Sequence, residues 1–309
     1  MSAAWLQALQ SGNVQEKWQA VRALRAAKND EARAALVAAL GDEEAIVRWE
    51  AAVSLARHMD SSVRESLTDA LASDDPRCQA AAADAVGQAA HVGEMVPLLR
   101  GLLASPSAAV RQAAACALGR ARDSSALPDL LSLVKDSSLT AAVRHSAFEA
   151  IAQIGPQDIG QETQSMLAEA LAGAFADPCP PVRAAAIKAI GRWHFHTLSP
   201  LLTQALYDGD IAVRWQAVRA AARVGTLAQV PLLRRLLTVH ETAFGKPFAA
   251  WAGYAISAII GRESARRIKA AWLRLCQRVG QLRSTVTTAQ AAVEASSEGD
   301  NPAGSEGQT

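Results

Sequence analysis

The sequence predicts an all-α protein in which about eight short helix pairs stack into a right-handed α–α superhelix. Two observations indicate this: a ten-residue phrase recurs along most of the chain, and leucine-rich helical segments alternate with its copies. The composition agrees, because alanine dominates the apolar residues, whereas there are only two tyrosines and five phenylalanines to favour strands. A single short helix pair cannot bury its apolar side, so stability must come from stacking on neighbouring pairs.

The recurring phrase has the form V-R-x-x-A-A-x-A-L-G and predicts one helix, here called helix B, in each repeat. Clear copies begin at Val47, Val110, Val143, Val182 and Val213, and weaker copies at Glu16, Cys78 and Ala252. The second position of the phrase recurs at intervals of 31, 31, 32, 33, 39, 31 and 39 residues. Such a register over eight copies is not expected by chance.

A second apolar segment precedes each copy and predicts a helix A. In Leu127–Asp136 and Leu198–Asp208, leucines recur at helical spacing after a proline in the first turn. A short loop with an acid follows, so each repeat is expected to be helix A, a tight turn, helix B and a Gly-containing turn. The two long intervals place insertions at residues 155–163 and 239–248, which either partner contacts or neutral drift would explain.

The phrase resembles HEAT repeats of the short kind, as in the phycobilisome-lyase HEAT-like family, and the resemblance covers about residues 2–261. In HEAT proteins an acid and the helix B arginine form a ladder along the stack, and the resemblance implies the same here. The acid lies six residues before the arginine in three pairs: Asp42 and Arg48, Asp177 and Arg183, and Asp208 and Arg214. Gln79 and Gly253 depart from this pattern in the third and eighth copies.

The C-terminal part differs in charge from the repeats. We expect the solenoid at residues 1–261, a basic amphipathic helix at 262–283 and a flexible tail at 284–309. The last two segments carry net charges of +6 and −4, against +1 for the whole chain. The helix would place Ile268, Trp272, Leu275 and Val279 on one face. It is predicted to cap the last repeat, although such a helix also suits a membrane surface or an acidic partner. The final residues are expected to be disordered.

No sequence motif indicates an enzyme or a bound metal. Phosphate-loop, nucleophile-elbow and zinc-protease motifs are all missing from the sequence. HEAT-fold iron enzymes use repeated His-Glu pairs, whereas this chain has only His240–Glu241. The near-neutral charge argues against a nucleic-acid partner. We expect a cytoplasmic protein without a transmembrane segment. The four cysteines are widely spaced, and the sequence shows neither a secretory signal nor an apolar run of about 20 residues.

Two local features are candidates for a metal site and for a reactive thiol. His194 and His196 lie between Trp193 and the next helix, but a closed metal site needs more ligands than this segment supplies, so a loop that packs its aromatic residues is expected. Cys179 precedes a helix start, which can lower a thiol pKa, but no histidine is positioned to assist it.

Helix B is expected to line the concave side of the stack. At 100° per residue, Val47, Ala51 and Leu55 share a buried side, and Trp49 and Arg57 point away from it. In the other copies, these outward positions form an aromatic row and a row near the helix C-termini in which five of eight members are arginine. The candidate partner-binding residues are Trp18, Trp49, Arg57, Arg120, Arg192, Trp215, Arg219, Arg223 and Tyr254.

Structural explanations compete with binding for both rows. Cations suit helix C-termini because of the helix dipole, and the tryptophans could simply pack on the next helix B. The dipole explains a cation, but it does not explain the repeated use of arginine, which prefers bidentate contacts with carboxylates. Exposed tryptophans beside arginines match the composition of protein-interface hot spots.

Two functions from different classes fit these observations. The first is a noncatalytic adaptor or assembly factor that grips the acidic segment of a protein partner and needs no cofactor. The second is a bilin lyase subunit or related chromophore-handling protein, which the phrase at Val47 implies through its resemblance to the phycobilisome-lyase family. Its arginines would then pair with bilin propionates. Because many HEAT proteins without bilins share the phrase, the first function is expected.

Overall fold

The computed structural model describes residues 2–26, 29–57, 59–89, 93–156, 159–238, 242–243 and 246–298. This part of the chain is almost entirely helical and forms two units, Met1–Ile259 and Ile260–Thr309. Its only strands are β1 (Thr242–Ala243) and β2 (Lys246–Pro247), a small antiparallel pair within the second insertion. The predicted all-α superhelix of stacked helix pairs is confirmed. No described helix combines the length and the apolar character that a bilayer span requires.

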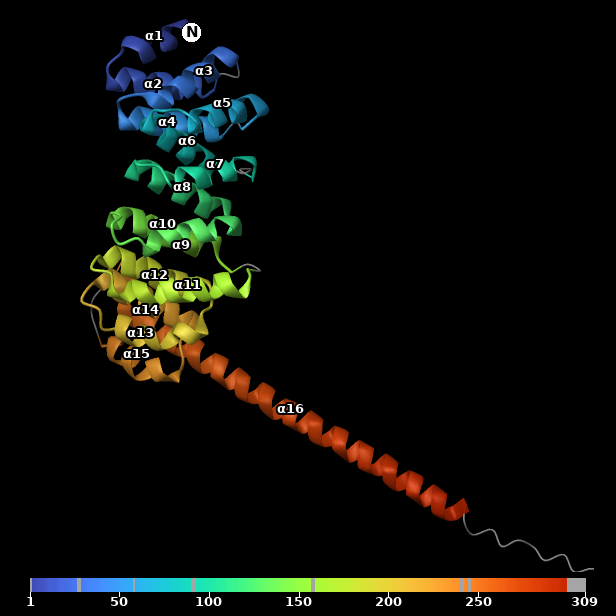
Figure 1. Cartoon of the computed structure of the whole chain (residues 1–309). Helices are drawn as coiled ribbons and strands as arrows, with labels where there is room; N and C mark the ends of the chain where they lie inside the picture. The colour runs from blue at the N-terminus through green and yellow to red at the C-terminus, as the bar shows by residue number, and fades with distance from the viewer. Residues whose placement is uncertain are drawn as a thin grey trace, which may run out of the picture. The chain divides into compact units, whose positions relative to one another are not determined.

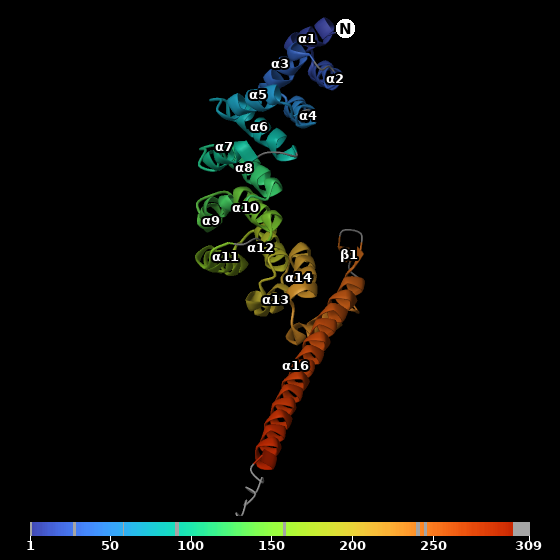
Figure 2. The same cartoon turned by 90° about the vertical axis from the view of Figure 1, so that its right-hand side faces the viewer.

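The first unit is built from eight helix pairs (Figure 1). The A helices are α1 (Ser2–Ser11), α3 (Asp30–Ala38), α5 (Ser61–Leu71), α7 (Val96–Leu102), α9 (Leu127–Lys135), α11 (Gln161–Gly173), α13 (Ser199–Ala205) and α15 (Val230–Leu236). The B helices are α2 (Val14–Leu24), α4 (Ala45–Ala56), α6 (Pro76–Gln88), α8 (Ala108–Ala121), α10 (Ala141–Ile154), α12 (Pro180–Arg192), α14 (Ile211–Val224) and the beginning of α16 (Phe248–Glu298). Within this unit the A helices lie on one side and helices α2 to α14 of the B set on the other, inner side (Figure 2).

Helix starts follow from polar caps and prolines in the sequence. Asn13 caps α2 and forms a reciprocal capping box with Glu16. The Asp210 carboxylate accepts the free backbone N–H groups of Ala212 and Val213 at the start of α14. Prolines occupy the first turns of α6, α7, α9, α12, α13 and α15, where a missing N–H costs nothing.

The glycine of the phrase lies inside helix B, not in the turn where it was expected. Gly87, Gly119 and Gly191 face the next B helix so closely that an added Cβ would lie 2.7, 2.6 and 3.0 Å from the Cα atoms of Ala117, Ala150 and Ala220. Real Cβ atoms essentially never come within 3.0 Å of another heavy atom. The glycine is therefore required because the backbones of adjacent B helices approach each other closely.

A ladder of ion pairs runs through the stack, as predicted, but each pair joins two repeats and not one. Arg144 donates to the Asp177 carboxylate of the next repeat, with Nε–Oδ2 and Nη2–Oδ1 distances of 2.9 and 3.2 Å. Arg183 binds Asp208 in the same way. The predicted pairing within one repeat exists only as a contact to the backbone, because Arg183 Nη1 donates to the carbonyl oxygen of Asp177 at 2.9 Å.

The C-terminal helix is longer than predicted. The last B helix does not end at Gly261, and α16 continues to Glu298, so residues 284–298 are helical where a flexible tail was expected. No proline interrupts the segment, and alanine, arginine and glutamine are strong helix formers. A cap formed by residues 262–283 stays a prediction, and residues 299–309 lie outside the described part of the chain.

Candidate functional site

Helices α14 and α16 of the first unit enclose a hollow of about 450 Å³ on the B-helix side. Arg219, Arg223 and Tyr254, three of the predicted residues, line it together with Trp251, Ala222 and Ala250. The Tyr254 side chain is 61% exposed and meets Trp251 edge-to-face, with ring centroids 5.9 Å apart. The structure thus places two guanidinium groups beside an aromatic wall that solvent can reach.

A third arginine, from the preceding repeat, lies next to this hollow. Arg192 on α12 and the pair Arg219 and Arg223 on α14 line the adjoining space between these helices. Burial lowers the pKa of Arg223, and the positive charges of Arg219 and Arg192 lower it further. Among the residues that the structure describes, no carboxylate forms an ion pair with any of the three. These three residues, the arginine cluster, therefore concentrate positive charge that an anionic ligand would relieve.

Trp251 was missed by sequence reasoning, and Trp215 was assigned wrongly. Trp215 is only 5% exposed, because its ring packs edge-to-face on Phe248 and Trp251 at centroid distances of 5.7 and 5.3 Å. It holds the beginning of α16 on α14 and is not available to a partner. Trp251 lies just before the last copy of the phrase, and its spacing of three residues from Tyr254 was the signal for a shared helix face.

A family model for HEAT repeats matches residues 2–87, 95–174 and 166–243, and a second model, for a HEAT-like repeat, matches residues 61–121. The chain belongs to the HEAT-repeat family. Neither match identifies the phycobilisome-lyase subtype. A comparison with curated proteins gave no match.

Several solved structures share this HEAT architecture. Kap121p bound to Pho4p is 15% identical, with a TM-score of 0.71 over 85% of this chain and 34% of that chain. The karyopherin Kap121p bound to the extreme C-terminus of the protein phosphatase Cdc14p is 14% identical, with a TM-score of 0.71 over 87% and 34% of the two chains. YIBA_ECOLI is 18% identical, with a TM-score of 0.59 over 82% and 91%. The chain thus spans about a third of Kap121p, and at these identities the likeness shows the fold.

Trp18 and Trp49, the two predicted tryptophans near the start of the HEAT stack, have different surroundings. Trp18 is half-buried, and its Nε1 donates to Glu50 at 3.2 Å. The guanidinium of Arg22 lies 4.7 Å from its ring centroid, so Trp18 belongs to an internal network. Trp49, in contrast, is 57% exposed and lines a hollow of about 280 Å³ that also contains Asp84. Of the two, Trp49 is accessible to a partner.

Arg57 and Arg120 are exposed but do not join the arginine cluster. Arg57 is the C-cap residue of α4, and Arg120 lies in the last turn of α8, where the helix dipole favours a cation. Burial raises the pKa of Asp84, and the nearby positive charge of Arg120 partly offsets that rise. Of the predicted row of arginines at the helix ends, the structure brings together only Arg192 and Arg223 with Arg219.

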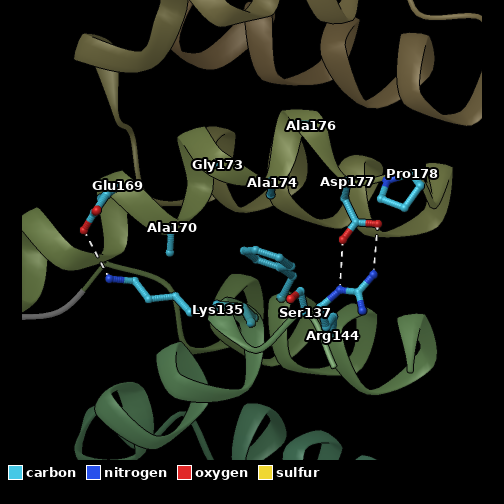
Figure 3. Close-up of a pocket in the computed structure, with 12 residues that line it drawn as sticks. Lys135, Ser137, Arg144, Glu169, Ala170, Gly173, Ala174, Ala176, Asp177 and Pro178 are labelled. Atoms are coloured by element: carbon cyan, nitrogen blue, oxygen red, sulfur yellow. Dashed lines mark hydrogen bonds and ion pairs between the residues drawn. The ribbon is translucent and has the colours of Figure 1, made fainter. Parts of the chain in front are cut away.

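Another hollow of the HEAT stack, of about 520 Å³, lies between the fifth and sixth repeats. Figure 3 shows its two cations turned toward carboxylates: Lys135 toward Glu169, at 3.1 Å, and Arg144 toward Asp177. The floor includes Phe148, which is 2% exposed. Because its charges are already paired, this hollow offers less to a charged ligand than the arginine cluster does.

The aromatic segment after α12 packs as predicted. Trp193 and Phe195 are buried and stacked, and Trp193 Nε1 donates to the Ile151 carbonyl oxygen at 2.8 Å. His194 and His196 are exposed. Within the described residues, no group of three His, Cys, Asp or Glu side chains is placed to hold a metal ion. His240 and Glu241 lie outside those residues.

Proposed function

We propose that this HEAT solenoid is a noncatalytic scaffold that binds a protein partner along its B-helix face, with an acidic segment of the partner at the arginine cluster. The observation that carries this proposal is the cluster itself. Arg192, Arg219 and Arg223 lie together without a described carboxylate, and the exposed Tyr254 lies beside two of them.

The chemistry of the hollow favours carboxylates. Arginine presents a planar fork of donors that matches a carboxylate in a bidentate contact, and such charge-assisted hydrogen bonds are stronger than neutral ones. Arginine and tyrosine are also enriched where interfaces gain most of their binding energy. Solved complexes of the similar solenoid Kap121p with Pho4p and with the extreme C-terminus of Cdc14p support a protein as the ligand class.

A defined peptide tests the proposal. We would measure, by fluorescence anisotropy at low salt, the binding of a labelled peptide with a run of glutamates to the full chain. The double variant R219Q/R223Q is expected to bind at least about tenfold more weakly, because two charge-assisted contacts are lost. The matched control is R234Q, which removes one charge from the exposed A-helix side of the last repeat. Equal binding by the wild type and R219Q/R223Q would refute the proposal.

A chromophore-handling protein is the second candidate, favoured by the same hollow. A bilin carries two propionates that arginines could hold, and the aromatic wall of Trp251 and Tyr254 could pack on its rings. The test is to mix the chain with phycocyanobilin and to record its visible absorbance. A shifted band that R219Q/R223Q abolishes would favour this candidate, and an unchanged spectrum would exclude it.

A further inference from the structure

From the third to the seventh repeat, one position of the B-helix face changes from acidic to basic. The seventh position of the phrase supplies one residue of this face per repeat: Arg22, Val53, Asp84, Cys116, Glu149, Lys188, Arg219 and Ala258. Asp84 and Glu149 are acidic, whereas Lys188 and Arg219 are basic. The change occurs between α10 and α12, where Lys188 forms an ion pair with Glu149. At this position Asp84 therefore precedes the change and Arg219 of the arginine cluster follows it, while Arg22 of the first repeat is basic.

Asp84 lines the hollow of about 280 Å³ beside the exposed Trp49. Its carboxylate forms no hydrogen bond or ion pair with another described residue. The other charged groups of this hollow are occupied: Arg77 pairs with Asp75 at 3.3 Å, and Arg48 donates to the carbonyl oxygens of the preceding loop. Arg120 faces Asp84 from the next repeat without a hydrogen bond.

An unpaired carboxylate beside an aromatic face fits a cation. A lysine or arginine side chain could place its charge at Asp84 and its stem or head over the Trp49 ring, which combines an ion pair with a cation–π contact. Burial raises the pKa of Asp84, the opposite of the ladder residue Asp208, whose pKa is lowered by its hydrogen bond from Arg183. The fold thus compensates the charge of Asp84 less well than that of Asp208, and a cation from a partner would supply the missing compensation.

We infer that the partner segment carries both charges in a fixed order, with a basic side chain over Asp84 and Trp49 and its acidic stretch over the arginine cluster. This inference rests on the proposed function and specifies the ligand further. Four steps between neighbouring B helices separate Asp84 on α6 from Arg219 on α14. At about 10 Å per step the distance is about 40 Å. An extended chain rises about 3.3 Å per residue, so about 12 residues separate the two charges.

The experiment uses three labelled peptides and the full chain. The first carries only the glutamate run, in a Gly-Ser background. The second adds two lysines about 12 residues from the glutamates, which is the spacing derived above. The third places the same lysines directly beside the glutamates. The second peptide is expected to bind about five- to tenfold more tightly than the first, and the third is expected to show no gain.

Variants assign the gain to the hollow. D84N is expected to abolish the gain of the second peptide and to leave the binding of the first unchanged. W49A is expected to reduce the gain. The matched control is D69N, an exposed carboxylate on α5 of the same repeat, which is expected to change neither.

The outcomes separate this inference from the proposed function. If the glutamate peptide binds but the lysines add nothing, or if their gain survives in D84N, the inference is overturned and the proposed function stands. A gain that is just as large for the third peptide overturns the fixed spacing. If none of the peptides binds, the proposed function fails, and the inference fails with it.

Discussion

Arg183 of the sixth repeat grips Asp208 of the seventh through two parallel hydrogen bonds, each with an N–O distance of 2.8 Å. The same arginine reaches back with Nη1 to the Asp177 carbonyl oxygen of its own repeat. Both side chains of the ion pair are largely buried, with 17% and 14% exposed. One side chain therefore fixes a loop and also links two neighbouring repeats.

Loss of this link should destabilise the stack. In D208N the amide oxygen can still accept the N–H of Asp210, but the charged pair with Arg183 is lost. We expect unfolding to become easier by about 2 kcal/mol, measured by thermal or urea denaturation followed by circular dichroism. The control is D129N. It breaks the ion pair between Arg100 and Asp129, which is more exposed than the pair between Arg183 and Asp208, and should cost less than about 1 kcal/mol. Equal losses in both variants would show that the ladder contributes no more than a surface ion pair.

The pH dependence of stability should differ in sign between Asp208 and Asp84. The hydrogen bond from Arg183 lowers the pKa of Asp208 below its ordinary value of 3.8. Its stabilising effect is therefore present above that ordinary value and is lost as the pH falls through the lowered pKa. D208N should accordingly flatten the acid limb of the stability curve. Urea denaturation of both chains between pH 2 and about 6 measures this limb. An unchanged acid limb in D208N would show that the ion pair of Arg183 and Asp208 does not contribute to stability.

Asp84 should behave in the opposite way. Burial raises its pKa in the folded state, so its favourable contribution exists at low pH and is lost as the pH rises through that raised pKa. At neutral pH, D84N should be more stable than the wild type, and the difference should shrink in acid. Urea denaturation at both pH values checks this. A D84N chain that is less stable at neutral pH would mean that the carboxylate has a stabilising partner.

Two glycine substitutions should change stability in opposite directions. In G119A the new Cβ would meet the Ala150 Cα at 2.6 Å, so the helices must separate, at a cost of about 1–3 kcal/mol. Gly101 on α7 has no neighbour within 4 Å of an added Cβ. G101A should therefore stabilise the chain by up to about 1 kcal/mol through its better helix propensity. Melting temperatures of the two variants give the comparison; if G119A melts no lower than the wild type, the close approach is not rigid.

Trp215 and Trp49, which occupy the same phrase position, should also differ. W215A removes a buried ring from between Phe248 and Trp251 and should cost about 3–5 kcal/mol. W49A removes an exposed ring and should change the unfolding free energy by less than about 1 kcal/mol. Chemical denaturation of both variants measures the contrast. A large loss of stability in W49A would place that ring in the core and remove it from the candidate surface.

Much of the fold was predictable because its signal is repeated. Eight copies of one phrase determine the helix pairs. The direction of the ladder was not predictable, because the distance between Arg183 and Asp208 depends on how one repeat stacks on the next. The role of Gly119 was missed for the same reason, since its neighbour Ala150 lies in another repeat.

The candidate site was predictable only in part. Helical spacing correctly placed Arg219, Arg223 and Tyr254 on one face. Trp215 occupies the same phrase position as Trp49, yet it is buried because the insertion before α16 brings Phe248 and Trp251 against it. The periodicity of one helix gives the direction of a side chain, but it does not reveal which later segment covers it.

The glycine-to-alanine contacts also determine the form of the first unit. Gly87, Gly119 and Gly191 let neighbouring B helices almost touch, whereas the A helices bury larger leucine side chains. Each repeat is consequently tapered, thin at its B edge and thick at its A edge. Tapered units in series curve into an arc with the thin edges on its inner side, so the B helices lie on the shorter, inner side of the first unit (Figure 2).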